Sequence, residues 1–242
     1  MAALTCASLF SSRTRSRGAY MFKVVTLLKR RPGMSVQDFQ RVWLHDHAAR
    51  AAQVPGLRCY VQSHTLLQGY VKGERIYDGI GEMVFHSEDA YLAARNSDVA
   101  QRAQRDLAEF TDTAQTVIMT VDVHVIVDGA IPRDGVKNVE FVNCRPGMDL
   151  TAFRRYWREH HGPLASGIPG MRRYEQNHLR LAEYADGSTP RYDGLAITWF
   201  DSTADMKQGA QTEVYARTRA DEARFLPDGH LPFIVTREHV IV

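Results

Sequence analysis

The sequence predicts an α+β fold in which two ferredoxin-like βαββαβ repeats pack as an intramolecular dimeric α+β barrel. Three observations carry this prediction. The chain repeats itself in one register over about a hundred residues, and both copies show the same order of strands and helices. Of the 242 residues, 44% are hydrophobic and 24% are charged, a globular composition that excludes intrinsic disorder and a fibrous structure.

The repeat begins with a motif that occurs twice. Residues 31–34 read Arg-Pro-Gly-Met and so do residues 145–148, a shift of 114 positions. One inserted residue changes the shift to 115, which then holds to the end of the chain. A register of this length indicates a tandem duplication. Identical residues occur in both copies at Phe39/Phe153, Trp43/Trp157, His47/His161, Tyr60/Tyr174, Gln62/Gln176, His64/His178, Phe110/Phe225 and His124/His239.

The duplication sets the expected domain boundaries. The copies span residues 21–127 and 137–242, and residues 128–136, rich in turn formers, make the linker. Residues 1–20 differ, because they contain three arginines and no acidic residue. Without these arginines the chain has 27 basic against 28 acidic residues, so the net charge falls from +2 to −1. We expect a disordered basic tail, either an organelle transit peptide or a non-native leader, outside the fold.

The first strand is expected at residues 22–29 in copy 1 and at the matching positions in copy 2. It is a run of apolar and β-branched residues, and a Pro-Gly pair ends it. Ser35, matched by Asp149, is a suitable N-cap for the next helix, because its side-chain oxygen can accept from a backbone N–H. Apolar residues at three- and four-residue spacing give that helix one buried face until Pro55-Gly56 ends it.

The second half of each copy supplies the remaining elements. Two strands are expected at residues 57–67 and 78–85. Ser87, matched by Ser202, then caps a second helical region. A last strand at residues 117–127 completes the order βαββαβ, which is that of the ferredoxin-like fold.

This order predicts a four-stranded antiparallel sheet with helices on one face only. The other face also needs cover, and the sheet of the second copy can supply it within one chain. We therefore expect a pseudo-dimer within the chain, which is able to pair again as a homodimer. Each half should hold a cavity, between the helices and the sheet or at the mouth of the barrel.

Both copies resemble the EthD domain. In copy 1 the resemblance rests on residues 29–35, Phe39, Trp43, His47, residues 55–58, Tyr60 and Gln62. In copy 2 it rests on residues 153–164 and 169–178. It implies a dimeric α+β barrel whose relatives are cofactor-free cyclases, dehydratases, lactone isomerases or decarboxylases, acting on polyketide-like or ring-cleavage products, alongside members of unknown role. Copy 1 departs from the pattern after its histidine, with Ala48-Ala49 in place of Gly162-Pro163, which predicts an altered or inactive site there.

His161 is the first candidate for a catalytic residue, and His47 is its counterpart. Each lies one turn after a tryptophan, near the end of the first helix. The unperturbed pKa of imidazole is close to neutrality, so this side chain can take up and return a proton at working pH. The alternative is a buried histidine that only caps the helix or packs in the core.

The second strand carries three polar side chains at alternate positions, Tyr174, Gln176 and His178. Alternation places them on one face of the sheet, where a phenol, an amide and an imidazole can bind and polarise a carbonyl or enolate oxygen. We assign catalytic roles to Tyr174 and His178 and a substrate-binding role to Gln176. The same face of copy 1 supplies Tyr60, Gln62 and His64 as candidate binding residues. An equally acceptable interpretation is a polar ladder between sheets.

Four further residues complete the candidate site. His124 and His239 lie in the last strand of each copy and are able to face the same cavity. Asp193 begins the third strand and is able to orient a histidine, although an Asp-Gly pair is also typical of a turn. Trp157 is included as a lining residue, although its helical spacing with Phe153 also suits a core anchor.

Several classes of function are excluded or disfavoured by the sequence. No Gly-rich phosphate loop or Gly-x-Ser-x-Gly motif occurs, and the histidine spacing does not support a metal site, so we expect neither a metal nor a cofactor. The near-neutral body gives no reason to expect nucleic acid as a partner, and no apolar run is long enough to span a membrane. Three widely spaced cysteines favour a reducing compartment, and we predict a cytoplasmic protein.

Two functions remain open. The first is a cofactor-independent lyase or isomerase that acts by histidine general acid/base catalysis on a small oxygenated organic molecule, in aromatic, polyketide or xenobiotic metabolism. The second is a non-catalytic protein that binds a hydrophobic ligand for an oxygenase or degradation system. A haem-binding variant of the barrel is a third, weaker interpretation. We favour the enzyme, because the histidine and the polar strand residues recur in both copies.

Overall fold

The computed structural model describes residues 9–10, 21–229 and 231–242. The chain forms two compact units. Unit 1 takes residues up to 121 together with 236–242, and unit 2 takes residues 122–235. The boundaries fall inside strands β4 (Val117–Val127) and β8 (Phe233–Val240), so each of these strands contributes to both units.

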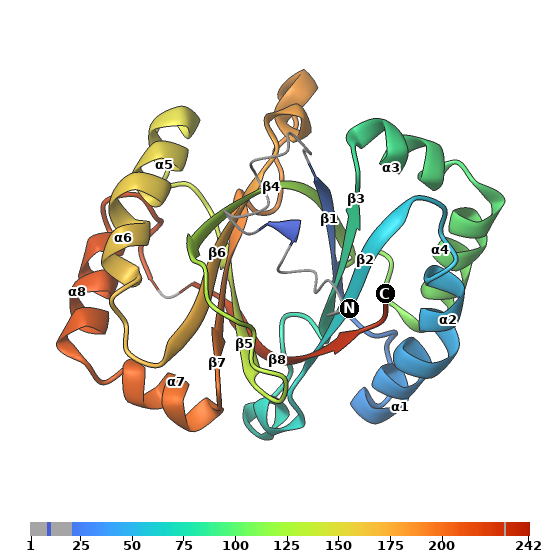
Figure 1. Ribbon diagram of the computed structural model, residues 1–242, viewed down its shortest axis with the longest axis horizontal. Helices are drawn as coiled ribbons and strands as arrows, with labels where there is room; N and C mark the ends of the chain where they lie inside the picture. The colour runs from blue at the N-terminus through green and yellow to red at the C-terminus, as the bar shows by residue number, and fades with distance from the viewer. Residues whose placement is uncertain (1–8, 11–20, 230) are drawn as a thin grey trace. The chain divides into compact units, whose positions relative to one another are not determined.

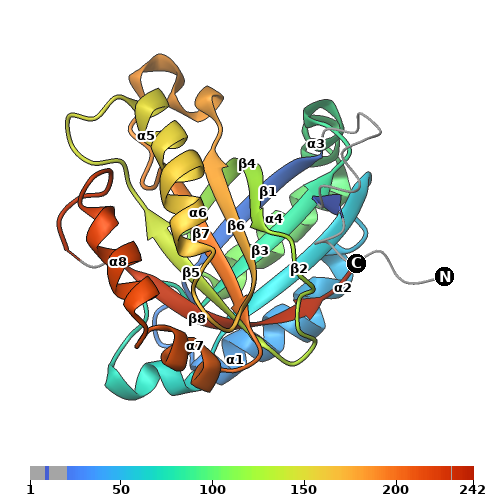
Figure 2. The same ribbon diagram turned by 60° about the vertical axis from the view of Figure 1, so that its left-hand side comes forward.

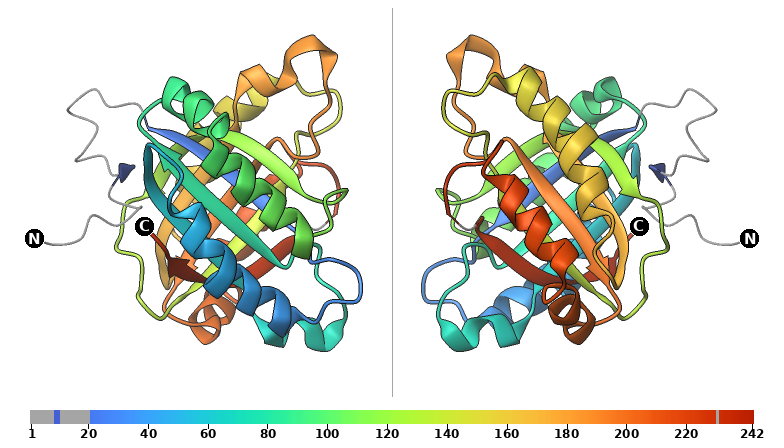
Figure 3. Two further views of the ribbon diagram at one scale, coloured as in Figure 1. Left: turned by 90° about the vertical axis from the view of Figure 1, so that its right-hand side faces the viewer. Right: turned by 90° about the vertical axis from the view of Figure 1, so that its left-hand side faces the viewer.

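Unit 1 contains the first copy of the repeat (Figure 1). Its antiparallel sheet has the order β4-β1-β3-β2, and the last part of β8 pairs with β2. The helices lie on one face of this sheet (Figure 3, left). The other elements of the copy are β1 (Phe22–Leu28), α1 (Val36–Arg41), η3 (Val42–His47), α2 (Ala48–Ala51), β2 (Leu57–Thr65), η4 (Leu67–Lys72), β3 (Gly79–Phe85), α3 (Glu88–Arg95) and α4 (Asp98–Phe110).

Unit 2 contains the second copy, built in the same way. Strand β7 lies between β5 and β6, and β8 begins beside β5, where the Phe141 N–H donates to the Pro232 carbonyl at 2.9 Å. Its helices also lie on one face of the sheet (Figure 2; Figure 3, right). The elements are β5 (Val136–Val142), α5 (Leu150–Tyr156), η5 (Trp157–His161), α6 (Gly162–Ala165), β6 (Met171–Leu179), η6 (Leu181–Gly187), β7 (Gly194–Phe200), α7 (Thr203–Gly209) and α8 (Glu213–Glu222).

The predicted order of elements and the predicted N-caps are confirmed in both copies. Ser35 and Asp149 accept hydrogen bonds from the backbone N–H groups of Asp38 (3.0 Å) and Ala152 (2.8 Å). The second helical region of copy 1 differs from the expectation, because it is two helices. Ser97 breaks it, since its hydroxyl accepts from the Ala100 N–H at 3.2 Å and starts α4.

A second difference lies within the first helix of each copy. The helix changes to π-helical hydrogen bonding at η3 and η5, where the N–H groups of Ala48 and Gly162 donate to carbonyls five residues earlier, those of Trp43 and Trp157. Apolar periodicity gave no signal for this change, since a π-helical turn adds only one residue to the turn. Such turns are frequent at functional sites.

The two π-helical turns place their tryptophans directly on the third strand of each copy. A Cβ added at Gly194 would lie 2.7 Å from the Trp157 ring, and one at Gly79 would lie 2.3 Å from the Trp43 ring. The Asp-Gly pairs therefore do not mark turns. Both glycines begin a strand without positive φ, and they are needed because the indole occupies the space of a side chain.

Three expectations concern the rest of the chain. The predicted basic tail lies outside the described residues except for Leu9 and Phe10, which are half-buried against Cys59, Val61 and Val84. The wide spacing of the cysteines predicts no disulfide framework. This prediction is wrong for Cys59, which is disulfide-bonded, whereas Cys144 is a free thiol. Across the part of the chain that the structure describes, no helix combines the length and the apolar character needed to cross a membrane.

Substitution of Gly79 tests the close approach of Trp43. Gly79→Ala is expected to destabilise the fold by about 1–3 kcal/mol, because the new methyl group overlaps the indole and must displace it. Gly81→Ala is the matched control on the same strand, since its Cβ would meet nothing nearer than 3.7 Å. Urea unfolding of both variants gives the comparison, and equal free energies of unfolding would contradict the packing argument.

Candidate functional site

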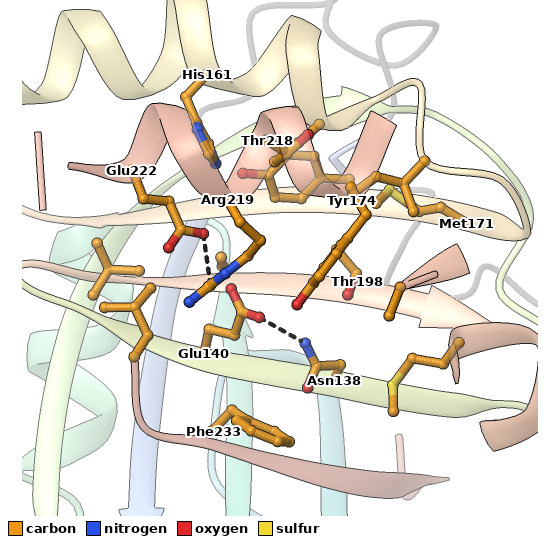
Figure 4. A pocket seen from close by; sticks show the side chains of 18 of the residues that line it. Asn138, Glu140, His161, Met171, Tyr174, Thr198, Thr218, Arg219, Glu222 and Phe233 are labelled. Carbon is orange, nitrogen blue, oxygen red and sulfur yellow. Dashed lines mark hydrogen bonds and ion pairs between the residues drawn. The ribbon is translucent and has the colours of Figure 1, made fainter. Parts of the chain in front are cut away.

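Unit 2 contains a cavity of about 220 Å³ between its helices and its sheet. Most of its wall is apolar, with Trp157, Met171 and Phe225 among the lining residues. The polar side chains gather on the walls shown in Figure 4. Those labelled there are Asn138, Glu140, His161, Tyr174, Thr198, Thr218, Arg219 and Glu222, and Lys207 and Tyr215 also line the cavity.

His161 reaches the cavity from the end of the π-helical turn η5. Its Nδ1 lies 3.0 Å from a carboxylate oxygen of Asp221 on α8. A carboxylate only accepts hydrogen bonds, so this contact assigns the proton to Nδ1 and leaves a lone pair on Nε2. Nε2 has no hydrogen-bond partner among the described residues. The free nitrogen is therefore available to a ligand in the cavity (Figure 4).

The environment of His161 keeps its imidazole neutral. Burial lowers its pKa below the usual value, and the hydrogen bond and charge of Asp221 only partly oppose this effect. Asp221 is itself held in place, because it accepts a 2.6 Å hydrogen bond from the Tyr156 hydroxyl. The result is a neutral imidazole in a fixed orientation, which is the form that a general base requires.

Tyr174 presents a hydrogen-bond donor to the same cavity. Its hydroxyl oxygen accepts from the Gln176 amide at 3.1 Å and from the indole of Trp157. Burial raises the pKa of Tyr174 above its usual value, so the phenol keeps its proton. With both acceptor sites of the oxygen engaged, the O–H group is free to donate to a ligand.

Gln176 holds this arrangement together rather than lining the cavity. Its side-chain amide donates at 2.8 Å to the Trp157 carbonyl, inside the π-helical turn, as well as to Tyr174. Its carbonyl oxygen lies 3.1 Å from Nε2 of His178. The amide therefore connects strand β6 to the turn that carries His161.

Glu222, which follows Asp221 directly, adds a second titratable group to the cavity. Burial raises its pKa to about 7, the charge of Glu140 contributes in the same direction, and Arg219 opposes both. Glu222 accepts a 2.7 Å hydrogen bond from the Arg219 guanidinium one turn earlier on α8. A carboxyl group with this pKa is partly protonated at neutral pH and can act as an acid.

The structure brings together only some of the predicted site residues of unit 2. His161, Tyr174 and Trp157 line the cavity, whereas Gln176, His178, His124 and Asp193 are not among its lining residues. His178 stacks on the indole of Trp157, with ring centroids 4.3 Å apart, and its ring meets that of His124 edge-on at 4.6 Å. Burial lowers the pKa of His178 to about 2, so it stays neutral.

Asp193 orients no histidine in the structure. Its carboxylate accepts from the backbone N–H of Cys144 at 2.6 Å and from the Tyr184 hydroxyl at 2.5 Å. It therefore connects the end of β5 to η6. The carboxylate that does orient the catalytic candidate is Asp221.

Copy 1 repeats the framework of the site. Its Gln62 amide donates to the Trp43 carbonyl (2.9 Å) and to the Tyr60 hydroxyl (3.0 Å), and His47 Nδ1 lies 2.8 Å from Asp106. The ring of His64 stacks on that of Trp43, and the ring of His239 meets that of His64. The predicted residues of unit 1 thus form the same buried network as their counterparts in unit 2, with His239 beside His64 and His124 beside His178.

The polar wall of the cavity is not repeated in copy 1. Positions equivalent to Asn138, Thr198, Thr218 and Glu222 carry apolar residues, and those of Glu140 and Arg219 carry uncharged ones. Met83 and Ala103 pack in an apolar cluster with Tyr60. The replacements are Val24, Met83, Ala103, Leu107, Thr26 and Gln104 in the same order.

The residues that sequence reasoning missed all lie on α8 or β5. They are Asp221, Glu222, Arg219 and Glu140. A signal for Asp221 was present, because Asp106 and Asp221 obey the shift of 115 that relates the copies. The other three differ between the copies, so a search for identical positions passes over them.

The cavity is suited to a small ligand. Its volume is below the range of about 300–1,000 Å³ that is usual for pockets of drug-sized ligands and cofactors. His161 is the one histidine among its lining residues. Among the residues that the structure describes, no group of three or more His, Cys, Asp or Glu side chains is arranged to hold a metal ion.

Comparison with solved structures supports the predicted fold. An anthrone oxidase-like protein is similar with a TM-score of 0.64 at 12% identity, over 92% of this chain and 94% of that one. Candidate monooxygenases from Fusobacterium nucleatum (0.58, 6%, 93% and 94%) and Lactobacillus acidophilus (0.53, 12%, 92% and 94%) are similar over comparable lengths. At these identities the likeness shows the fold alone. No curated protein matches the chain.

The family is established by the sequence match. The EthD domain model matches twice, at residues 31–114 and at residues 145–228, once in each copy of the repeat. The predicted fold class, two ferredoxin-like repeats of the dimeric α+β-barrel type in one chain, is confirmed. The chain belongs to the EthD family and carries two EthD domains in tandem.

Proposed function

We propose that the cavity of the second EthD domain is the active site of a cofactor-independent lyase or isomerase that acts on a small oxygenated organic molecule. The observation that carries this proposal is the pair formed by Asp221 and His161 at the wall of an apolar cavity. The pair holds a neutral imidazole whose Nε2 has no hydrogen-bond partner among the described residues. The small cavity favours one compact substrate, from aromatic, polyketide or xenobiotic metabolism.

The proposed chemistry is proton transfer at a carbon next to a carbonyl group. His161 Nε2 accepts the proton, and the electron pair of the C–H bond moves onto the carbonyl oxygen to give an enolate. The Tyr174 hydroxyl donates a hydrogen bond to that oxygen, because its own acceptor sites are engaged. The proton then returns from the imidazolium, or from the Glu222 carboxyl, to a different carbon in an isomerase or to the leaving group in a lyase.

Removal of His161 tests the base directly. Exchange of the α-protons of 1-tetralone in D₂O, followed by NMR, is expected to slow by about 10²- to 10⁴-fold in His161→Ala, the usual loss for a general base. His47→Ala is the matched control in the first domain and is expected to stay within about twofold of the parent. Undiminished exchange in His161→Ala would contradict the proposal and favour the non-catalytic ligand-binding function.

Asp221 is expected to act on the titration of His161. The carboxylate raises the pKa of His161 through its hydrogen bond and its charge, so Asp221→Asn should lower that pKa further. An NMR titration of the imidazole Cε1–H resonance measures the change. Asp106→Asn, which alters the partner of His47 instead, should leave the His161 titration in place. An unchanged or higher pKa in Asp221→Asn would show that the pair does not form in solution.

Glu222 is expected to set the alkaline limb of the pH profile. Its pKa is raised to about 7, so the protonated form that donates to substrate is present below that pH and is lost above it. His161, whose pKa is lowered by burial, stays deprotonated and active below its usual pKa. The rate constant kcat/KM for exchange should therefore fall as pH rises through about 7. Glu222→Gln stays neutral and should remove this limb; a profile identical to the parent would contradict the role.

A further inference from the structure

We propose that Glu140, together with the Arg219–Glu222 pair, selects the ligand of this cavity by charge: it admits neutral molecules that carry hydrogen-bond donors and rejects carboxylates. The inference rests on the proposed function only in using the same cavity as the ligand site. It assigns a specificity role to Glu140 and Arg219, which take no part in the proposed proton transfer, and to Glu222, which there returns the proton.

Glu140 projects from strand β5 into the polar part of the cavity. Figure 4 shows its carboxylate beside Asn138, whose amide donates to it at 3.3 Å. A carboxylate at this place presents only acceptor oxygens to a ligand. A ligand group next to Glu140 must therefore supply the hydrogen.

The charge of Glu140 reaches the groups around the cavity. It contributes to the raised pKa of Glu222 and Tyr215 on α8 and of Tyr174 on β6. Each of these groups is therefore harder to ionise because a negative charge is already close. A ligand carboxylate in the same space would meet the same repulsion.

Arg219 does not offset this repulsion for a ligand. Its guanidinium donates to Glu222 at 2.7 Å, so its positive charge is paired above about pH 7, where Glu222 is ionised. Lys207, the other cation that lines the cavity, is exposed to solvent. A ligand anion would have to compete with Glu222 for the guanidinium, in the presence of Glu140.

The remaining polar groups suit a neutral ligand. His161 Nε2 accepts a hydrogen bond, and the Tyr174 hydroxyl donates one. With Glu140 as a second acceptor, the complementary ligand has a carbonyl group and hydroxyl or amide hydrogens. The apolar wall and the volume of about 220 Å³ suit a body of one or two rings, since a cavity of about 150 Å³ already holds benzene.

The comparison of the two domains supports a selective role for these charges. The first domain keeps the histidine–aspartate pair but has Thr26, Gln104 and Leu107 at the positions of Glu140, Arg219 and Glu222. The framework of the site is therefore stable without the three charged groups. Their presence in the second domain is a property of its cavity rather than a requirement of the fold.

Calorimetric titration of the full chain with three matched probes tests the proposal. 2-Naphthol is neutral with a hydroxyl donor, 2-naphthoate is an anion, and 2-naphthylmethylamine is a cation at neutral pH. We expect 2-naphthol and the amine, which can both supply a hydrogen to Glu140, to bind more tightly than 2-naphthoate. Glu140→Gln should weaken 2-naphthol by about tenfold, since a hydrogen bond to a charged acceptor is replaced by a neutral one, and should tighten 2-naphthoate.

Glu213→Gln is the matched control, because it removes an exposed carboxylate from α8 that does not line the cavity. It should leave all three affinities unchanged. The proposal is overturned if 2-naphthoate binds the parent protein as tightly as 2-naphthol, if none of the three binds, or if Glu140→Gln leaves their order and affinities unaltered. The affinities of the three probes are ranked in the parent protein, so this part of the test does not depend on whether a variant folds.

Binding and turnover separate this proposal from the proposed function. If charge selection holds but His161→Ala exchanges protons normally, the cavity is a selective binding site without the proposed chemistry. If His161→Ala loses exchange while the probes bind without regard to charge, the chemistry stands and the selectivity fails.

Discussion

The hydrogen bond from the Gln176 amide to the Trp157 carbonyl joins strand β6 to the π-helical turn, and the position of the site residues depends on it. The same amide fixes the Tyr174 hydroxyl, and the carbonyl belongs to the turn that ends at His161. A buried amide that lost these partners would leave several polar groups without hydrogen bonds, at about 1–3 kcal/mol each. The donor and the base of the cavity therefore share one support.

Comparison with the first domain distinguishes the role of this hydrogen-bonded framework from the role of the cavity. Gln62, Trp43 and Tyr60 form the same hydrogen bonds, and His47 keeps its aspartate, although apolar residues replace most of the polar wall. The histidine–aspartate pair thus has a structural use, because it connects the end of the first helix to α4. The pair supports the proposed catalysis in the second domain because there the histidine also lines a cavity. The groups that distinguish the second domain are the carboxyl of Glu222 and its charged neighbours.

The repeat explains why the sequence predicts the fold well. Each strand of copy 2 could be placed by its match in copy 1, and the alternation of Tyr174, Gln176 and His178 correctly put them on one face. The roles within that face were not predictable, because alternation does not say which side chain meets a cavity. His178 packs on the indole at 4.3 Å, while only Tyr174 lines the cavity. The π-helical turn was also hidden, since it leaves the apolar spacing almost unchanged.

Sequence reasoning missed several site residues because it used identity between the two copies as its guide. Identity between copies marks what both domains need, which is the framework, and Asp106 and Asp221 belong to it. A site that only one domain has must be sought where the copies differ. The positions of Glu222 and Glu140 are examples, because the equivalent residues of copy 1 are Leu107 and Thr26. At each position the second copy has a buried or partly buried carboxylate where the first has an uncharged side chain. A buried charge is costly unless it is paired or used, so these differences point to the cavity of the second domain.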